Sequence, residues 1–370
     1  MPLHIGRITL EHFRNHRFFD SGTLARTAVF IGPNGSGKTN VLEAIDLVIS
    51  GRSFRQARLE DVVEWGEASA QVRLFGTRDG AQTEVEERIA FDGDRRLLID
   101  GIEKKRRSEA LRGTHTVVFR PDDLDLVKGS ADVRRDAIDA LGGRLSDAYA
   151  HTRREYLKVV RHRNALLREW KATKTDLAVW TQQAVMLGAR LLVHRRRLVA
   201  RLFDHVAAQH ENLSEAAVLS VEYHDRCGLG ITDPHVEVSL DEAKAALAAE
   251  FVNRESDERE RATTVVGPHR DDLVLLLDGR EARRFASQGQ QRSIALAWRI
   301  GEMRTIADVS GAEPILLLDD VMSELDERRR AALQACIGEA VQTMITTTDR
   351  SHVPETGEAV SVVDLGRSDG

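Results

Sequence analysis

The feature that most constrains this 370-residue chain is the stretch VFIGPNGSGKTNVLEAI at residues 29–45. Apolar residues lead into a glycine-rich turn that ends in Lys38 and Thr39, and a helical pattern follows until Gly51. The turn fits GxxxxGKT between a strand and a helix. Its glycines let backbone N–H groups point at a common centre, next to the positive end of the helix dipole. The stretch therefore predicts a loop that holds nucleotide phosphates.

Two side chains of this loop are expected to carry most of its chemistry. Lys38 would neutralise charge on the β- and γ-phosphates, and Thr39 would coordinate Mg²⁺. The residues predicted to contact the nucleotide are Gly32, Pro33, Asn34, Gly35, Ser36, Gly37, Lys38, Thr39 and Asn40. The alternative is a glycine turn without a ligand, and the matching strand and helix on its two sides count against it.

A second acidic segment lies far along the chain, in EPILLLDDVMSELD at residues 313–326. Residues 315–318 predict a buried strand that ends in two carboxylates. Because ligands bind at the carboxyl ends of parallel strands, we expect Asp319 to hold Mg²⁺ through water. Asp320 would polarise an attacking water, so Asp320 and Lys38 are the predicted catalytic residues. The alternative is an ordinary strand followed by an acidic turn, which the phosphate loop disfavours.

A third segment, FASQGQQRSIALAWRIGEM at residues 285–303, places small and amide residues before an amphipathic helix. A Ser–Gly turn at a helix start can bind an anion. Its alternative is a plain helix cap made by Ser287, which would be preferred if the first two segments were absent.

The pattern of elements predicts an α/β domain interrupted by helices. Strand patterns fill the first 125 residues and return after Arg261, while residues 131–209 read as long helices without sustained heptads. We therefore expect a discontinuous domain of residues 1–130 plus 255–370, with an inserted helical arm at residues 131–254.

Charge is distributed unevenly along the chain. The formal net charge is −6, yet residues 151–205 carry 13 Lys and Arg against 4 Asp and Glu. This excludes a uniformly basic nucleic-acid binder and predicts a local patch that binds the DNA backbone, with a solvated helix face as the alternative. The candidate DNA-binding residues are Arg153, Arg154, Arg161, Arg163, Arg195, Arg196 and Arg197.

Cysteine and hydropathy patterns narrow the protein class further. Two distant cysteines without a CxxC pair exclude a disulfide framework and a cysteine zinc site. No apolar run approaches the length of a membrane span, and the N-terminus has no apolar signal core. We expect a cytoplasmic protein with no membrane contact.

Together these segments resemble the ATP-binding-cassette heads of the SMC/Rad50 type, and among them the RecF family of bacterial recombination mediators. The doubled Asp319–Asp320, the glutamine-rich segment at Ser287 and the short helical arm are specific features of this resemblance. The other segments that carry it are LEHFRNHRFF from Leu10, FRPDDLDLVKGSADVRRDAID from Phe119, VVGPHRDDL from Val265 and MITTTD ending at Asp349.

The resemblance implies a mixed-sheet ABC-type ATPase head that dimerises head to tail around two ATP molecules. Residues Ser287, Gln288, Gly289 and Gln290 would be a signature motif that faces the γ-phosphate of the partner subunit. Asp326 would form the D-loop at the dimer seam, and Thr347 or Thr348 would act as the switch. Arg14 or Asn15 would reach the nucleotide edge, and the sequence does not decide which.

The resemblance also implies a function: a weak, DNA-stimulated ATPase with ATP and Mg²⁺ as cofactors. The ATP dimer would bind double-stranded and gapped DNA and help RecR and RecO load RecA. Rival interpretations are an SMC/Rad50-like structural DNA clamp, a transporter ATPase subunit, and a small-molecule phosphotransferase. The Q-loop equivalent stays open between Gln71 and Asp122 or Asp123, and the GPHRDD segment at residues 267–272 receives no chemistry.

Overall fold

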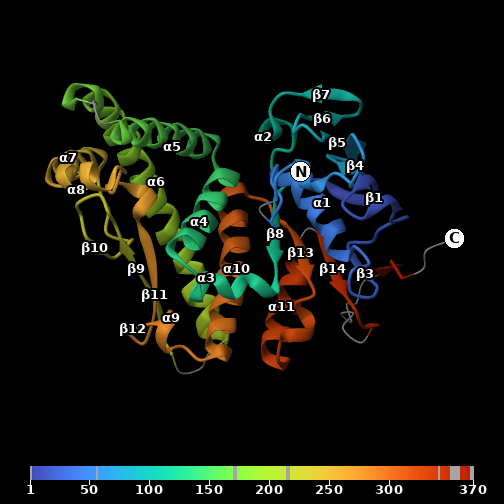
Figure 1. Cartoon of the computed structure of the whole chain (residues 1–370). Helices are drawn as coiled ribbons and strands as arrows, with labels where there is room; N and C mark the ends of the chain where they lie inside the picture. The colour runs from blue at the N-terminus through green and yellow to red at the C-terminus, as the bar shows by residue number, and fades with distance from the viewer. Residues whose placement is uncertain are drawn as a thin grey trace. The chain divides into compact units, whose positions relative to one another are not determined.

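The computed structural model describes residues 2–55, 57–169, 173–213, 217–340, 342–350 and 359–366 (Figure 1). The chain is α/β, as the sequence predicts, and forms two compact units. The first comprises Met1–Asp122 and Met303–Gly370, and the second Asp123–Glu302. The second unit is wider than the predicted arm of residues 131–254 and includes Ser287. The division into functional domains at residues 131 and 254 stays a prediction.

A five-stranded parallel sheet organises the first unit, with the strand order β15-β3-β14-β13-β8. Its strands are β15 (Val360–Asp364), β3 (Thr27–Ile31), β14 (Gln342–Thr347), β13 (Ile315–Asp319) and β8 (Thr116–Phe119). The central strands read as continuous buried runs rather than alternating ones, which is typical of parallel sheets. The carboxyl ends of β3, β14 and β13 therefore meet at one edge.

The first unit also contains a six-stranded antiparallel sheet with the order β2-β1-β4-β5-β6-β7. Its strands are β1 (His4–Phe13), β2 (His16–Asp20), β4 (Ser69–Arg78), β5 (Ala81–Ala90), β6 (Arg95–Ile99) and β7 (Ile102–Lys104). The Asp79–Gly80 turn joins β4 to β5, and both residues have positive φ, as a type I′ hairpin turn requires.

Helix α1 (Lys38–Ser50) contacts strands of both sheets in the first unit. Its apolar face carries Val41, Leu42 and Ile45, which are fully buried in a core shared with β1, β4 and β14. Gly51 ends the helix in the left-handed conformation, as expected for a C-terminal glycine. The short elements of this unit are η1 (Glu60–Val62), α2 (Arg107–Ala110), η4 (Met322–Glu324) and α11 (Glu327–Glu339). Packing of α1 thus fixes where the glycine loop leaves the sheet.

The second unit is mainly helical. Its long helices are α4 (Ala131–Leu145), α5 (Asp147–Arg168), α6 (Lys174–Leu213) and α7 (Leu240–Asn253), and α5 packs along α6 (Figure 1). A four-stranded sheet has the order β10-β9-β11-β12, made of β10 (Ile231–Thr232), β9 (Leu219–His224), β11 (Asp272–Leu277) and β12 (Arg280–Glu281).

The remaining elements of this region are short, except for one helix. They are η2 (Pro121–Leu124), α3 (Asp125–Lys128), α8 (Glu255–Arg261), η3 (Pro268–Arg270), α9 (Ala282–Phe285) and α10 (Gln288–Ser310). Among all helices of the described ranges, none combines the length and the apolarity needed to span a membrane.

Candidate nucleotide site

The glycine loop connects β3 to α1, as its sequence predicts, and two of its glycines adopt left-handed conformations. Gly35 has a φ of 83° and Gly37 a φ of 95°. A Cβ atom at Gly37 would lie 2.3 Å from His16 Nε2 and 2.7 Å from Asn15 Oδ1, so no larger residue fits. The loop therefore keeps its backbone in a conformation that only glycine adopts readily.

Lys38 lies inside this loop. Its buried Nζ donates hydrogen bonds to the carbonyl oxygens of Gly32, at 2.7 Å, and Pro33, at 3.0 Å. The ammonium group therefore lies against the backbone of the loop, a position from which a lysine can neutralise phosphate oxygens.

The loop is joined directly to the acidic strand end. Thr39 Oγ1 donates a hydrogen bond of 2.7 Å to Asp319 Oδ1, across 280 residues of sequence. A hydroxyl and a carboxylate oxygen are the hard ligands that Mg²⁺ prefers, so the donor set here suits the predicted ion. Thr39 and Asp319 are thus brought together as candidate metal ligands.

A residue that the sequence interpretation missed, Thr346, completes this junction. Strand β14 lies between β3 and β13, so the acidic strand is not the immediate neighbour of the phosphate-loop strand. Thr346, near the end of β14, has its Oγ1 2.9 Å from Asp319 Oδ1 and accepts a hydrogen bond of 3.0 Å from Asp320 N. Its buried position in a TTT run gave no distinguishing signal.

Asp320 turns the chain sharply after the strand. Its φ is 52°, which is uncommon for a residue other than glycine. The bond to Thr346 helps to hold this conformation. Strained backbone conformations of this kind are concentrated at functional sites, which supports Asp320 as a candidate functional residue.

The predicted switch residues end β14 at the same edge. Thr347 is buried, and its carbonyl oxygen accepts a hydrogen bond of 3.4 Å from Gly32 N. Thr348 is exposed. Of the two, Thr347 contacts the phosphate loop through its backbone, while Thr348 presents its side chain to solvent.

The turn between β1 and β2 holds the loop from the other side. Asn15 Nδ2 donates a hydrogen bond of 3.2 Å to Gly35 O, and Asn15 Oδ1 accepts one of 2.7 Å from Asn40. Arg14 instead donates from Nε to the fully buried Glu43 of α1, at 3.0 Å. Of the two open candidates, Asn15 contacts the loop and Arg14 braces the helix behind it.

Arg55 is a second residue that sequence reasoning missed. Its Nη1 donates a hydrogen bond of 2.8 Å to Asn40 Oδ1 and lies 3.4 Å from Glu43 Oε2. The buried carboxylate of Glu43 is thus shared by two arginines, Arg14 and Arg55. Nothing in the basic stretch after Gly51 distinguishes Arg55 from its neighbours in sequence.

The predicted signature lies in the second unit, where Ser287 caps α10. Ser287 Oγ accepts from Gln290 N at 3.3 Å, and Gln290 Oε1 accepts from Ser287 N at 2.8 Å. This reciprocal pair is a capping box. Ser287 and Gln288 are exposed, and Gly289 is half-buried. The helix-cap alternative therefore describes this chain by itself, and the role toward a partner stays a prediction.

Asp326 begins α11 in the same manner. Its side chain accepts a hydrogen bond of 3.0 Å from Arg329 N and pairs with the Arg329 guanidinium. About half of the side chain remains exposed. Its place at a dimer seam is likewise a prediction.

Three of the seven DNA-binding candidates are wrong, because their side chains are buried and bonded inside the second unit. Arg195 is 2% exposed and donates to Asp139 at 3.1 Å and to Pro268 O at 2.6 Å. Arg163 pairs with buried Glu258, and Arg196 donates to the carbonyl oxygen of Asp233 at 2.8 Å. A phosphate backbone cannot reach these groups.

The GPHRDD segment belongs to the same buried network. His269 Nδ1 is bonded to Tyr156 Oη at 2.7 Å, and Nε2 lies 3.2 Å from Thr264 O. Burial lowers the pKa of His269 to about 4, so the ring is neutral at pH 7. Asp271 accepts from Tyr223 Oη at 2.7 Å. The side chains of His269 and Asp271 are thus bonded to other residues of the second unit.

The exposed candidates form a smaller basic face. Arg154 and Arg161 are exposed on α5, and Lys158, which the prediction omitted, lies between them. Their spacing of four and three residues places all three on one side of the helix. Arg197 is exposed but pairs with Glu237 at 3.0 Å, and Arg153 is bonded to Asp139 and Asp136.

The Q-loop candidates are placed in different surroundings. Gln71 lies on β4 and is bonded to Glu86 on the neighbouring strand. Asp123 is buried and pairs with Arg299 at 2.6 Å, whereas Asp122 is exposed. The polar groups of Gln71 and Asp123 are thus committed to protein partners.

A glycine loop joined to an acidic strand end by hydroxyl and carboxylate groups, in a unit that combines a parallel and an antiparallel sheet, is typical of an ABC-type P-loop ATPase head. Residues 4–367 match the family described as RecF/RecN/SMC N terminal domain. An SMC head domain from Pyrococcus furiosus superposes with a TM-score of 0.50 at 16% identity, covering 94% of this chain and 90% of that chain, which supports the fold.

More similar proteins narrow this class. The DNA replication and repair protein RecF of Heliobacterium modesticaldum is 38% identical over 352 residues, which are 94% of this chain and 92% of that protein. A solved structure of the recombination mediator protein RecF-ATP in the RecFOR pathway has a TM-score of 0.88 at 27% identity, covering 99% and 97% of the two chains. The chain belongs to the RecF family.

Proposed function

We propose that this chain is an ATP-dependent DNA-binding protein of recombinational repair, and that ATP holds two copies of it together on DNA. The observation that carries the proposal is the Thr39–Asp319 bond beside the enclosed Lys38, which brings together side chains that would bind phosphate and Mg²⁺. Family membership and the RecF-ATP relative support ATP as the nucleotide.

The residues of the site would divide the work of hydrolysis. Lys38 and the loop N–H groups would bind the β- and γ-phosphates, and Thr39 with Asp319 would hold Mg²⁺, which neutralises developing charge on the phosphates. Asp320 follows Asp319 at the strand end and would orient the attacking water. An aspartate has a shorter reach than the glutamate found in related heads, so we expect slow turnover, suited to a switch.

The signature would act on the nucleotide of a second copy. Ser287 and Gln288 are exposed in the single chain and lie at the start of α10, which is the positive end of the helix dipole. Such a helix start would supply donors to a γ-phosphate held by the Lys38 loop of the partner subunit. Hydrolysis would remove that phosphate, and the dimer would then dissociate.

The α5 face would supply the DNA contacts. Arg154, Lys158 and Arg161 form a basic row on α5, and among the described residues His162 of the same helix stacks on Trp180. A basic row of this kind suits the backbone of duplex or gapped DNA. By analogy with the RecFOR relative, RecR and RecO would be partners, and the complex would promote loading of RecA at gaps.

The central experiment measures the mass of the particle by light scattering with ATP and Mg²⁺. Wild type is expected to dimerise, and Lys38→Met to stay monomeric because it loses nucleotide binding. Ser287→Arg should bind ATP as a monomer, since the missing contact belongs to the partner's nucleotide. A wild-type protein that remains monomeric in saturating ATP would refute the dimer.

ATPase rates separate the rival functions. Stimulation by duplex DNA in wild type, absent in Lys38→Met, supports the proposal. Binding of ATP and DNA without turnover would instead identify a structural clamp. Turnover that DNA leaves unchanged counts for a transporter subunit, and a rate raised by a small hydroxyl compound counts for a phosphotransferase.

A further inference from the structure

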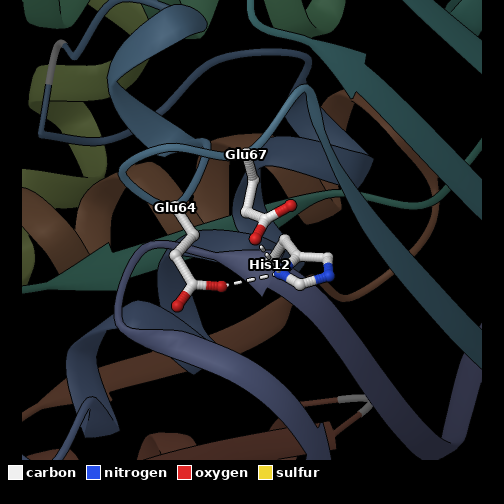
Figure 2. Close-up of side chains that lie close together, drawn as sticks. All are labelled: His12, Glu64 and Glu67. Carbon is white, nitrogen blue, oxygen red and sulfur yellow. Dashed lines mark hydrogen bonds and ion pairs between the residues drawn. The ribbon is translucent and has the colours of Figure 1, made fainter.

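Three side chains of the first unit converge away from the nucleotide loop: His12, Glu64 and Glu67 (Figure 2). His12 is the second-to-last residue of the long strand β1, and the two glutamates flank the turn that follows η1. His12 Nδ1 lies 2.7 Å from Glu64 Oε2 and 3.8 Å from Glu67 Oε1. The three possible ligand atoms all lie within 4.8 Å of one another. A nitrogen and two oxygens thus lie close to one another.

The backbone holds these residues in register with one another. Glu64 N donates a hydrogen bond of 2.8 Å to His12 O, Arg14 N donates one of 2.8 Å to Val62 O, and Phe13 forms a bridge with Val63. Two segments far apart in sequence are therefore held together by backbone bonds next to the cluster. A site on such a frame loses little conformational freedom when a ligand binds.

The arrangement differs from an ordinary histidine–carboxylate pair. At His235 the two neighbouring carboxylates bind opposite ring nitrogens: Asp204 is 3.0 Å from Nε2 and Asp233 is 2.8 Å from Nδ1. One ion cannot bind all three of those groups. At His12 both carboxylates approach the same nitrogen, Nδ1, as ligands of a shared ion do.

We propose that His12 Nδ1 and one oxygen each of Glu64 and Glu67 bind a divalent transition-metal ion, with Zn²⁺ as the best match. Zn²⁺ binds imidazole nitrogen and carboxylate oxygen at about 2.0–2.2 Å, which sets tetrahedral ligands about 3.4 Å apart. The separations of 2.7 and 3.8 Å bracket this value, so Glu64 needs to withdraw by less than about 1 Å. The imidazole disfavours Mg²⁺ and Ca²⁺, which prefer all-oxygen sites.

Charge balance supports a dication. Two carboxylates and a neutral imidazole sum to −2, and the ion would replace the proton that otherwise sits between His12 and Glu64. The bound ion would fasten the turn at residues 64–67 to the strand end at His12. Trp65, 98% exposed between the two glutamates, is a natural reporter of that change.

The test is titration of the full chain with Zn²⁺ alone, without nucleotide, at pH 8, against a competing chelator. Wild type is expected to bind one equivalent more than His12→Gln, with at least tenfold weaker binding in Glu67→Gln. His235→Gln is the matched control and should bind as wild type does. Zn²⁺ should also change Trp65 fluorescence, and Trp65→Phe should lose this signal while keeping the equivalent.

Glu67→Gln separates the proposal from a simple His12–Glu64 ion pair. Glu67 lies beyond hydrogen-bond distance of His12. If the cluster is only a His12–Glu64 ion pair, Glu67→Gln should therefore leave Zn²⁺ binding unchanged. Equal Zn²⁺ binding by wild type, His12→Gln and Glu67→Gln would overturn the site. Thermal unfolding of each variant verifies that it is folded. Because no nucleotide is present, the result does not depend on the proposed ATPase function.

Discussion

Two clusters of charged residues, one in each unit, place their charges in opposite settings. In the first unit Lys38, Thr39 and Asp319 meet at the edge of a parallel sheet, where oxygen ligands and an ammonium group can act on a phosphate. In the second unit Arg195 and Asp139 satisfy one another in the interior. Both clusters join residues distant in sequence, but only the first leaves its charges available for a ligand.

The electrostatics of the buried cluster follow from that enclosure. Burial by itself would raise the pKa of Asp139, but Arg195 and Arg153 outweigh it and hold the pKa below its ordinary value. The carboxylate is therefore charged and depends on its arginines. A positive segment of sequence can thus be the scaffold of a domain rather than its binding surface.

The largest effect is expected from removing the buried arginine. Arg195→Met removes one of the two arginines that pair with Asp139 and the cation beside Asp271, and breaking a buried ion pair costs about 3–5 kcal/mol. Urea unfolding followed by circular dichroism should show early loss of helix, while Arg197→Met, on the surface next door, should change stability by less than about 0.5 kcal/mol. Similar curves for both variants would contradict the contrast between the clusters.

Lowering the pH should destabilise the same buried network through protonation of His269. Its folded pKa of about 4 lies below the unfolded value of about 6.5, so the unfolded chain binds more protons between these pH values. Stability from this group is present above pH 6.5 and is lost as the pH falls toward 4, by at most about 3 kcal/mol. His269→Gln should flatten that part of the stability–pH curve. An equally steep curve would show that other groups cause the loss.

Asp320→Asn tests the cluster of the first unit, at the candidate nucleotide site. The substitution keeps the shape and removes the charge that would orient water, so ATP binding and the dimer should persist. Turnover should fall about 100-fold, equivalent to about 2.7 kcal/mol. Single-turnover kinetics and a filter-binding assay for ATP measure the two properties separately. Unchanged turnover would assign the base elsewhere.

The smallest effect is expected on the exposed α5 face. Lys158→Ala and Arg161→Ala together should lower the slope of log affinity for duplex DNA against log salt by about 1.8, since each lost phosphate contact contributes about 0.9. Lys244→Ala, which removes a half-buried cation on α7 paired with Asp241, is the control. A slope that stays at the wild-type value would remove α5 from the DNA path.

Local patterns predict the phosphate loop and the acidic strand end because glycine spacing, strand and helix periodicity, and the GKT sequence all lie within short windows. They also predict the α/β class. The partners of individual side chains were not predictable. Arg195 and Arg197 are two residues apart in one basic run, yet one is sealed inside the fold and the other faces solvent. Helix rotation decides this, and the packing of neighbouring elements sets that rotation.

Thr346 and Arg55 could not be predicted because their roles depend on contacts that form only in the folded chain. Strand order is a property of the whole sheet, and only the insertion of β14 between β3 and β13 brings Thr346 against Asp319. A sequence without the sheet order offers three adjacent threonines with equal claims.

The position of β14 has a mechanical implication. The last two residues of β14 contact both parts of the nucleotide site. The side chain of Thr346 is hydrogen-bonded to Asp319, and the carbonyl oxygen of Thr347 accepts a hydrogen bond from Gly32 N. The residue after that, Thr348, is already at the surface. If the proposed Mg²⁺ and triphosphate bind here, any rearrangement at Asp319 is only two peptide bonds from the protein surface, where a second molecule could detect it.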